Sequence, residues 1–162
     1  VFEAPGHLVV SALLKSGDKE YANNTLVWQK GLQRIVRTTF PTDGEFTLHI
    51  KQKIAVASEW SDGVTYTITK PIGSDETFPT LHGILQKNGN LLLNPILGKL
   101  KTGQKYNFKL KLPSAESVKV NSTELVEQND VFEGVVEATA DTTVFVKRFE
   151  KDFEKAVTYD AQ

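Results

Sequence analysis

Apolar and polar side chains alternate along most of the chain with a period of two residues. In the segment GEFTLHIKQK, Phe46, Leu48 and Ile50 fall on one parity and polar residues fall on the other. This period is typical of a β-strand, whose successive side chains point to opposite faces of a sheet. Similar runs, some rich in β-branched and aromatic residues, occur in YNFKLKL, TTVFVKRF, VTYTIT and RIVRTTF. No long stretch keeps the period of about 3.6 residues of an amphipathic helix.

Clusters of glycine, proline, asparagine and aspartate separate these runs. They are KSGD, PTDG, SDG, PIGSD, KNGN and KTGQ. Such clusters are typical of turns, because glycine and asparagine adopt backbone conformations that tight turns need. Many short strands with turns between them predict an all-β sandwich or barrel.

The tripeptide Val-Thr-Tyr occurs twice, in GVTYTI and in AVTYDA. Earlier blocks match in the same order: PGHLVVSALL with TGQKYNFKLKL, NTLVWQ with TELVEQ, and IVRTTFPTDGEFTLHIK with VVEATADTTVFVK. Four blocks in one order predict two related β-units in tandem. Valine and tyrosine share a parity, so we expect Val64 and Tyr66, like Val157 and Tyr159, to point inward and the threonines outward.

The joint between the two units is expected in Lys70–Pro79, where proline, glycine and acidic residues cluster. The predicted domains are residues 1–70 and 71–162, both antiparallel β-sandwiches, with the first short of strands. The second copy carries an extra segment, TLHGILQKNGNLLLNPILGKL, which predicts two short strands around an Asn-Gly turn. Either the first copy lacks these strands, or a cut that produced Val1 removed them.

Composition narrows the function classes. The chain has 162 residues, no cysteine, no methionine and a formal net charge of −1. The lack of cysteine excludes disulfides, thiolate metal sites and a cysteine nucleophile. A near-neutral chain has no general attraction to nucleic acid or to an anionic membrane. Because the chain starts at Val1, we interpret it as a piece of a longer protein.

Candidate chemistry is sparse. The three histidines, His7, His49 and His82, match no zinc-binding spacing. We interpret His49 as a solvated strand residue and His82 as a hydrogen-bonded residue in apolar surroundings. No nucleophile-elbow motif, phosphate loop or paired aspartates stand out. We therefore expect no catalytic, cofactor-binding or metal-ligating residues.

The two tryptophans are the candidate partner-binding residues. Trp28 aligns with Glu127 of the second copy, so it is expected to point outward or to pack in the joint between copies. Trp60, beside the SDG turn, has the same two options. An exposed tryptophan is a candidate contact for a protein or a sugar. Asn23 and Asn121 open two glycosylation sequons, which we interpret first as turn residues and whose glycosylation stays open.

One family resembles this pattern. The segments FPTDGEFTLHI and GVTYTI, then TGQKYNFKLKLPSAESVKV, VFEGVVEA, VFVK and AVTYDA, resemble the immunoglobulin-like domains of the kyphoscoliosis peptidase family. In that family a transglutaminase-like domain with a Cys-His-Asp triad lies upstream. The resemblance implies that the two predicted domains are immunoglobulin-like β-sandwiches in tandem. It also implies a non-catalytic scaffold module, cytoplasmic or cytoskeletal, that binds a protein partner. The alternatives are an extracellular carbohydrate-binding or adhesin module that uses Trp28 or Trp60, and a hydrolytic enzyme.

Overall fold

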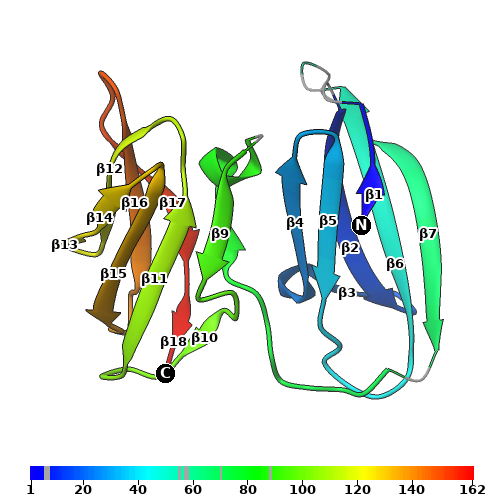
Figure 1. Cartoon of the computed structure of the whole chain (residues 1–162). Helices are drawn as coiled ribbons and strands as arrows, with labels where there is room; N and C mark the ends of the chain where they lie inside the picture. The colour runs from blue at the N-terminus through cyan, green and yellow to red at the C-terminus, as the bar shows by residue number, and fades with distance from the viewer. Residues whose placement is uncertain (6–7, 55, 57–58, 70, 88) are drawn as a thin grey trace. The chain divides into compact units, whose positions relative to one another are not determined.

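The chain forms two compact units in a computed structural model. The structure describes residues 1–5, 8–54, 56, 59–69, 71–87 and 89–162. The units are Val1–Thr77 and Phe78–Gln162, so the division lies after residue 77 and not after residue 70 (Figure 1). Strands dominate both units, and the only helices among the described residues are two short 3-10 turns, η1 and η2. The expected all-β class is confirmed.

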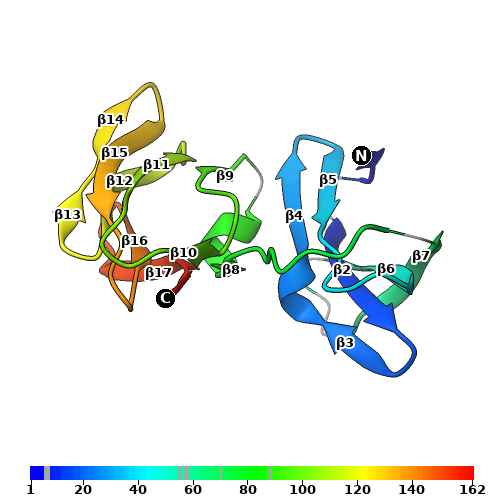
Figure 2. The ribbon, with the colours of Figure 1, turned by 90° about the horizontal axis from the view of Figure 1, so that it is seen from below.

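Unit 1 is built from two antiparallel sheets. Its elements are β1 (Phe2–Glu3), β2 (Leu8–Ser16), β3 (Lys19–Tyr21), η1 (Ala22–Asn24), β4 (Thr25–Lys30), β5 (Gln33–Thr38), β6 (Glu45–Ile54) and β7 (Ser61–Thr69). One sheet has the order β1-β5-β4 and the other β3-β2-β6-β7. Figure 2 shows the ribbon from below. The four-stranded sheet therefore ends at β3 on one side and at β7 on the other.

The apolar side chains of β6 that alternate along the sequence lie on the buried face of the four-stranded sheet. Leu14 of β2, and Phe46 and Ile50 of β6, are all nearly inaccessible to solvent. We call the face that carries these three side chains the inner face. Phe46 packs against the rings of Tyr21 and Phe40, with centroid distances of 5.8 and 5.4 Å. Such tilted contacts are favourable between aromatic rings.

A buried arginine ties the loops at one end of unit 1 together. Arg34 of β5 is 1% exposed. Its guanidinium donates hydrogen bonds to the carbonyl oxygens of Leu8 (2.9 Å), Gly31 (3.1 Å) and Pro5 (3.2 Å). A guanidinium offers five N–H donors in a fixed plane, so one side chain can satisfy several buried carbonyls. Arg34 thus links the start of β2 to the turn between β4 and β5.

Unit 2 contains two larger sheets and one parallel pair. Its elements are β8 (Thr80–Leu81), η2 (Gly83–Gln86), β9 (Leu91–Asn94), β10 (Lys99–Leu100), β11 (Lys105–Lys111), β12 (Ala115–Val120), β13 (Thr123–Glu124), β14 (Val126–Gln128), β15 (Val131–Glu137), β16 (Thr143–Arg148), β17 (Phe153–Thr158) and β18 (Asp160–Ala161). The sheets have the orders β14-β15-β11-β9 and β13-β12-β16-β17-β8, while β10 pairs with β18. Both sheets supply one apolar core, which includes Phe108, Leu110, Val118, Phe132, Val146 and Val157.

The tandem repeat is visible in the sheet orders. The order β3-β2-β6-β7 corresponds to β13-β12-β16-β17, and β4-β5-β1 corresponds to β14-β15-β11. By this correspondence β2 matches β12, which corrects the alignment of PGHLVVSALL with TGQKYNFKLKL. One alternating strand resembles another in sequence, so the alignment had slipped by a strand. In the described part of unit 1, β8, β9 and β10 have no counterparts.

The extra segment of unit 2 forms strands in the expected region but not a hairpin. β8 pairs with β17, whereas β9 pairs with β11 in the other sheet. The turn η2 lies between them and buries Ile84 and Leu85. The segment therefore crosses from one sheet to the other and closes this side of the unit 2 core.

Candidate functional site

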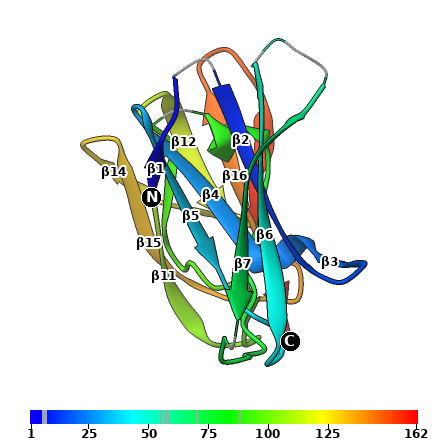
Figure 3. The same cartoon turned by 90° about the vertical axis from the view of Figure 1, so that its right-hand side faces the viewer.

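The most exposed strand of unit 1 is β7, at the end of the four-stranded sheet. Eight of its nine residues are exposed to solvent, and Ile68 is half-buried. No strand of the described part of the chain lies beyond it (Figure 3). A strand in this position presents unpaired backbone N–H and C=O groups along its outer edge.

The side chains of β7 alternate between the two faces of the sheet. Tyr66 is paired with Leu48, and Ile68 with Phe46, so these two face inward. Val64 lies two residues before Tyr66 and shares that face. Val64, Tyr66 and Ile68 together form what we call the β7 strip. Val64 is 51% and Tyr66 49% exposed, although both lie on the inner face.

The corresponding residues of unit 2 are fully covered. Val157 is 0% and Tyr159 3% exposed. The ring of Tyr159 packs edge-on against Phe108 at 5.6 Å. Val157 is also paired with Leu81 of β8, which covers the end of β17 at Val157 and Thr158. The four Val and Tyr side chains thus share the expected inward parity, but they are buried only in unit 2.

The difference follows from what faces each strand. In unit 1 the opposing sheet has three strands, and one of them, β1, is two residues long. In unit 2 the opposing sheet has four strands, including β9, and β8 extends the sheet beyond β17. Parity selects the direction of a side chain, whereas burial depends on the second sheet. The β7 strip points inward but has little to pack against.

The edge of β7 also lacks the usual protection against pairing. It is nine residues long, whereas the other strands at sheet edges have two to six residues. Residues 64–69 contain neither charge nor proline, and Asp62 is the single charged residue of the strand. Natural proteins usually block an edge by short length, lysine, proline or a bulge. Here a register shift in the pairing with β6, between His49 and Lys51, protects the start of β7 only.

Trp60 lies at the start of β7 and is 43% exposed. The Nζ atom of Lys53 lies 5.0 Å from the centre of its ring. This is within the range of a cation–π contact. The side chain of Trp60 is thus partly exposed directly before β7, which is one of the two expected options.

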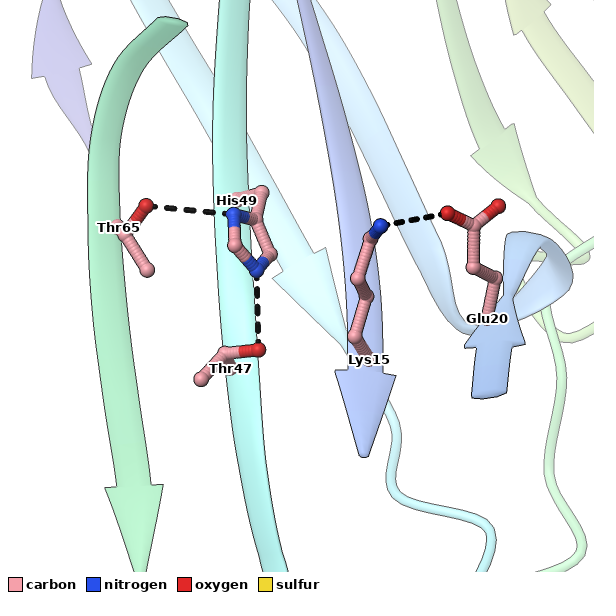
Figure 4. Close-up of polar contacts among 5 residues, drawn as sticks. All are labelled: Lys15, Glu20, Thr47, His49 and Thr65. Carbon is pink, nitrogen blue, oxygen red and sulfur yellow. Dashed lines mark hydrogen bonds and ion pairs between the residues drawn. The ribbon is translucent and has the colours of Figure 1, made fainter. Parts of the chain in front are cut away.

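The outer face of the same sheet is polar. His49 lies between two threonine hydroxyls, with Nε2 3.0 Å from Thr47 Oγ1 and Nδ1 3.3 Å from Thr65 Oγ1 (Figure 4). Lys15 and Glu20 form an ion pair of 2.6 Å farther along the sheet. The hydrogen bond from Lys15, followed by its charge, lowers the pKa of Glu20 below its ordinary value. These contacts are those of a solvated sheet surface that could also supply hydrogen bonds to a ligand.

Trp28 differs from the expectation of an outward-facing ring. It lies on β4 opposite Ile35 and is 5% exposed. The guanidinium of Arg37 lies 5.1 Å from its ring centre. The alignment with Glu127 misled here, because similar strand sequences do not guarantee similar cover. Trp28 is therefore not an exposed partner-binding residue.

The remaining candidates have structural partners or lie outside the described residues. His82 Nε2 is 2.9 Å from Thr158 Oγ1, as expected for a hydrogen-bonded histidine. Asn121 uses both side-chain atoms: Nδ2 donates to Thr139 Oγ1 and Oδ1 accepts from the Thr143 N–H. Asn23 is exposed in η1. His7 lies outside the described residues.

The described residues contain neither a metal-binding cluster nor a membrane-spanning helix. No three His, Asp or Glu side chains lie close enough together to hold a metal ion. No helix is long and apolar enough to cross a membrane.

Comparisons with known proteins give one structural likeness to report. No family model and no curated protein matches the chain. The solved structure of SGBP-B from the Bacteroides ovatus mixed-linkage glucan utilization locus, in complex with a mixed-linkage heptasaccharide, is similar at 9% identity and a TM-score of 0.25. The alignment covers 95% of this chain and 37% of that one. The resemblance to the kyphoscoliosis peptidase family, and with it the immunoglobulin-like assignment, stays a prediction.

Proposed function

We propose that the chain is a non-catalytic binding module that takes up a protein partner by addition of a strand to β7. The observation that supports this is the contrast between β7 and β17. The last two residues of β17, Val157 and Thr158, are paired with β8, whereas β7 is an exposed end strand with an apolar strip on its inner face. Strand addition supplies affinity through main-chain hydrogen bonds and specificity through alternate side chains.

Unit 2 indicates the chemistry that such a partner needs. β8 pairs antiparallel with β17 through Leu81 and Thr80. The chain then continues through a hydrogen bond of 2.9 Å from the His82 N–H to the Ala156 carbonyl and buries Ile84. A partner of β7 would likewise be extended, with uncharged residues at the pairing positions and an apolar side chain placed over Tyr66.

Binding is tested by selecting a displayed library of linear peptides on the full chain. We expect enriched peptides with alternating apolar residues, whose binding is lost in Tyr66→Lys. Lysine on an edge strand opposes pairing by placing a hydrated charge there. Val126→Lys is the matched control, because Val126 is a 74% exposed valine on the edge strand β14. Selection that yields no binders, or binders that Tyr66→Lys retains, would overturn the proposal.

A carbohydrate-binding module is the second candidate, and Trp60 favours it. Its ring is 43% exposed, and the ring of a sugar can stack on such a surface. Lys53 beside the ring, and His49 with Thr65 farther along the outer face, could donate hydrogen bonds to hydroxyl groups. The TM-score of 0.25 is too low to transfer a ligand from SGBP-B. Gel retardation by a mixed-linkage glucan that is lost in Trp60→Ala would support this candidate, and unchanged migration would exclude that glucan.

A further inference from the structure

We infer that the strand added to β7 is β7 of a second copy of the chain, paired antiparallel about a two-fold axis near Tyr66. The inference rests on the proposed docking at β7 and names its partner. Three observations lead to it. Apolar residues and threonines alternate in residues 64–69, these residues carry no charge, and the opposite edge of the sheet is short and charged.

The alternation makes β7 complementary to itself. Apolar residues fall at 64, 66 and 68, and threonines at 65, 67 and 69. An antiparallel pairing centred on Tyr66 places Val64 opposite Ile68 and Thr65 opposite Thr67. Aromatic, β-branched and Thr–Thr pairs across strands are stabilising. The β7 strips of both copies then lie on one face, where they form a continuous apolar surface.

The charges are compatible with this pairing. Residues 64–69 carry none, so no like charges meet between identical strands. Asp62 is the one charged residue of β7, and antiparallel pairing places the two copies of Asp62 at opposite ends of the contact. The register shift between β6 and β7 lies between Thr65 and Asp62, which limits the regular part of the strand to its second half. Asp62 thus lies beyond the paired segment.

The opposite edge of the sheet favours a closed dimer over a filament. That edge is β3, which has three residues, Lys19, Glu20 and Tyr21. Glu20 is held in its ion pair with Lys15. A short, charged strand is a poor template for further pairing. Of the two described edges of this sheet, β7 is then the one that joins copies, and two identical strands that satisfy each other form a closed two-fold interface.

Sedimentation velocity of the full chain tests the inference. The monomer has a mass of 18.0 kDa, so a dimer has about 36 kDa (2 × 18.0). We expect a dimer fraction that rises with concentration from about 10 µM to 1 mM, the range of weak interfaces. Val64→Lys and Tyr66→Lys should remain monomeric, while Val126→Lys should behave as the unsubstituted chain. Far-UV circular dichroism of each variant checks that the fold persists.

A cysteine variant tests the register independently. The chain has no cysteine, so Tyr66→Cys introduces a single thiol. In the inferred pairing the two introduced thiols lie directly opposite, where antiparallel Cα atoms are about 4.5–5.5 Å apart and a disulfide can form. Mild oxidation should give a covalent dimer with Tyr66→Cys and none with Val126→Cys.

The outcomes separate the inference from the proposed function. A chain that stays monomeric at 1 mM, or a dimer that persists in Tyr66→Lys, would overturn the second copy as partner. If peptides selected on the monomeric chain still lose binding in Tyr66→Lys, docking at β7 stands and the self-pairing alone fails. If the chain neither forms a dimer nor selects peptides that depend on Tyr66, the inferred self-pairing and the proposed docking at β7 are both wrong.

Discussion

The phenol hydroxyl of Tyr159 donates a hydrogen bond of 2.8 Å to the carbonyl oxygen of Pro95. This bond is buried, and it joins the end of β17 to the segment that follows β9. Tyr66 ends the matching tripeptide of unit 1, yet its side chain is 49% exposed. The same three residues thus close a core in one unit and border an open edge in the other.

The first prediction compares phenylalanine at both positions. Tyr159→Phe should lower the free energy of unfolding of unit 2 by about 1–2 kcal/mol, because it leaves the buried Pro95 carbonyl without its donor. Tyr66→Phe should change the stability of unit 1 by less than about 0.5 kcal/mol. Urea unfolding followed by circular dichroism measures both. Equal losses at the two positions would contradict the assigned difference in burial.

The burial of Tyr159 should also affect how the stability of the fold depends on pH. Burial raises the pKa of Tyr159 above its ordinary value. Above about pH 10, the ordinary tyrosine pKa, the unfolded chain loses this proton while the folded chain keeps it. The unfolded state then binds fewer protons, so stability falls as the pH rises. The fall between pH 9.5 and 11 should be smaller in Tyr159→Phe, and an identical profile would contradict the burial.

Trp28 should behave as an interior residue. Trp28→Glu places a carboxylate at a buried position and should lower the free energy of unfolding by about 3–5 kcal/mol. Trp28→Phe should stay within about 1.5 kcal/mol of the unsubstituted chain, because the indole Nε1 has no hydrogen-bond partner among the described residues to lose. Thermal unfolding of both variants measures this. If the Trp28→Glu variant is as stable as the unsubstituted chain, Trp28 is a surface residue and its assigned burial is wrong.

The ion pair on the outer face makes a prediction about one carboxyl group. Lys15 lowers the pKa of Glu20, first by its hydrogen bond and then by its charge. In Lys15→Met the pKa of Glu20 should rise toward its ordinary value of about 4.3. A lowered folded pKa stabilises the fold above the unfolded pKa, and this contribution is lost as the pH falls through the folded pKa. A carbon-detected NMR titration that leaves Glu20 unchanged in Lys15→Met would contradict the pairing.

Much of the fold follows from the sequence, and the limits have physical causes. The alternation of Phe46, Leu48 and Ile50 predicts a strand and its inner face, because both are local properties of the backbone. The exposure of Val64 does not follow, because it depends on a facing sheet that a strand's own sequence does not encode. Trp28 is the reverse case: its alignment with an exposed glutamate says nothing of the groups that cover it.

One available signal pointed to the candidate site. The second copy is preceded by a segment that supplies β8 and β9, and the described residues before the first copy hold no counterpart of it. A strand at the end of the described sheet with an uncharged sequence such as VTYTIT is a candidate docking edge. The sequence alone could not identify which strand lies at an uncovered sheet edge, because that assignment requires the order of the strands in the sheet.

Amide hydrogen exchange of β7 at two chain concentrations tests the central claim most directly. At low concentration, amides of residues 64–69 that point away from β6 should exchange rapidly, while those of β17 should be protected. At high concentration, or with a saturating selected peptide, residues 64–69 should become protected in the unsubstituted chain and in Val126→Lys, but not in Tyr66→Lys. If β7 is as protected as β17 at the lowest concentration, or gains no protection under either condition, strand addition at β7 is wrong.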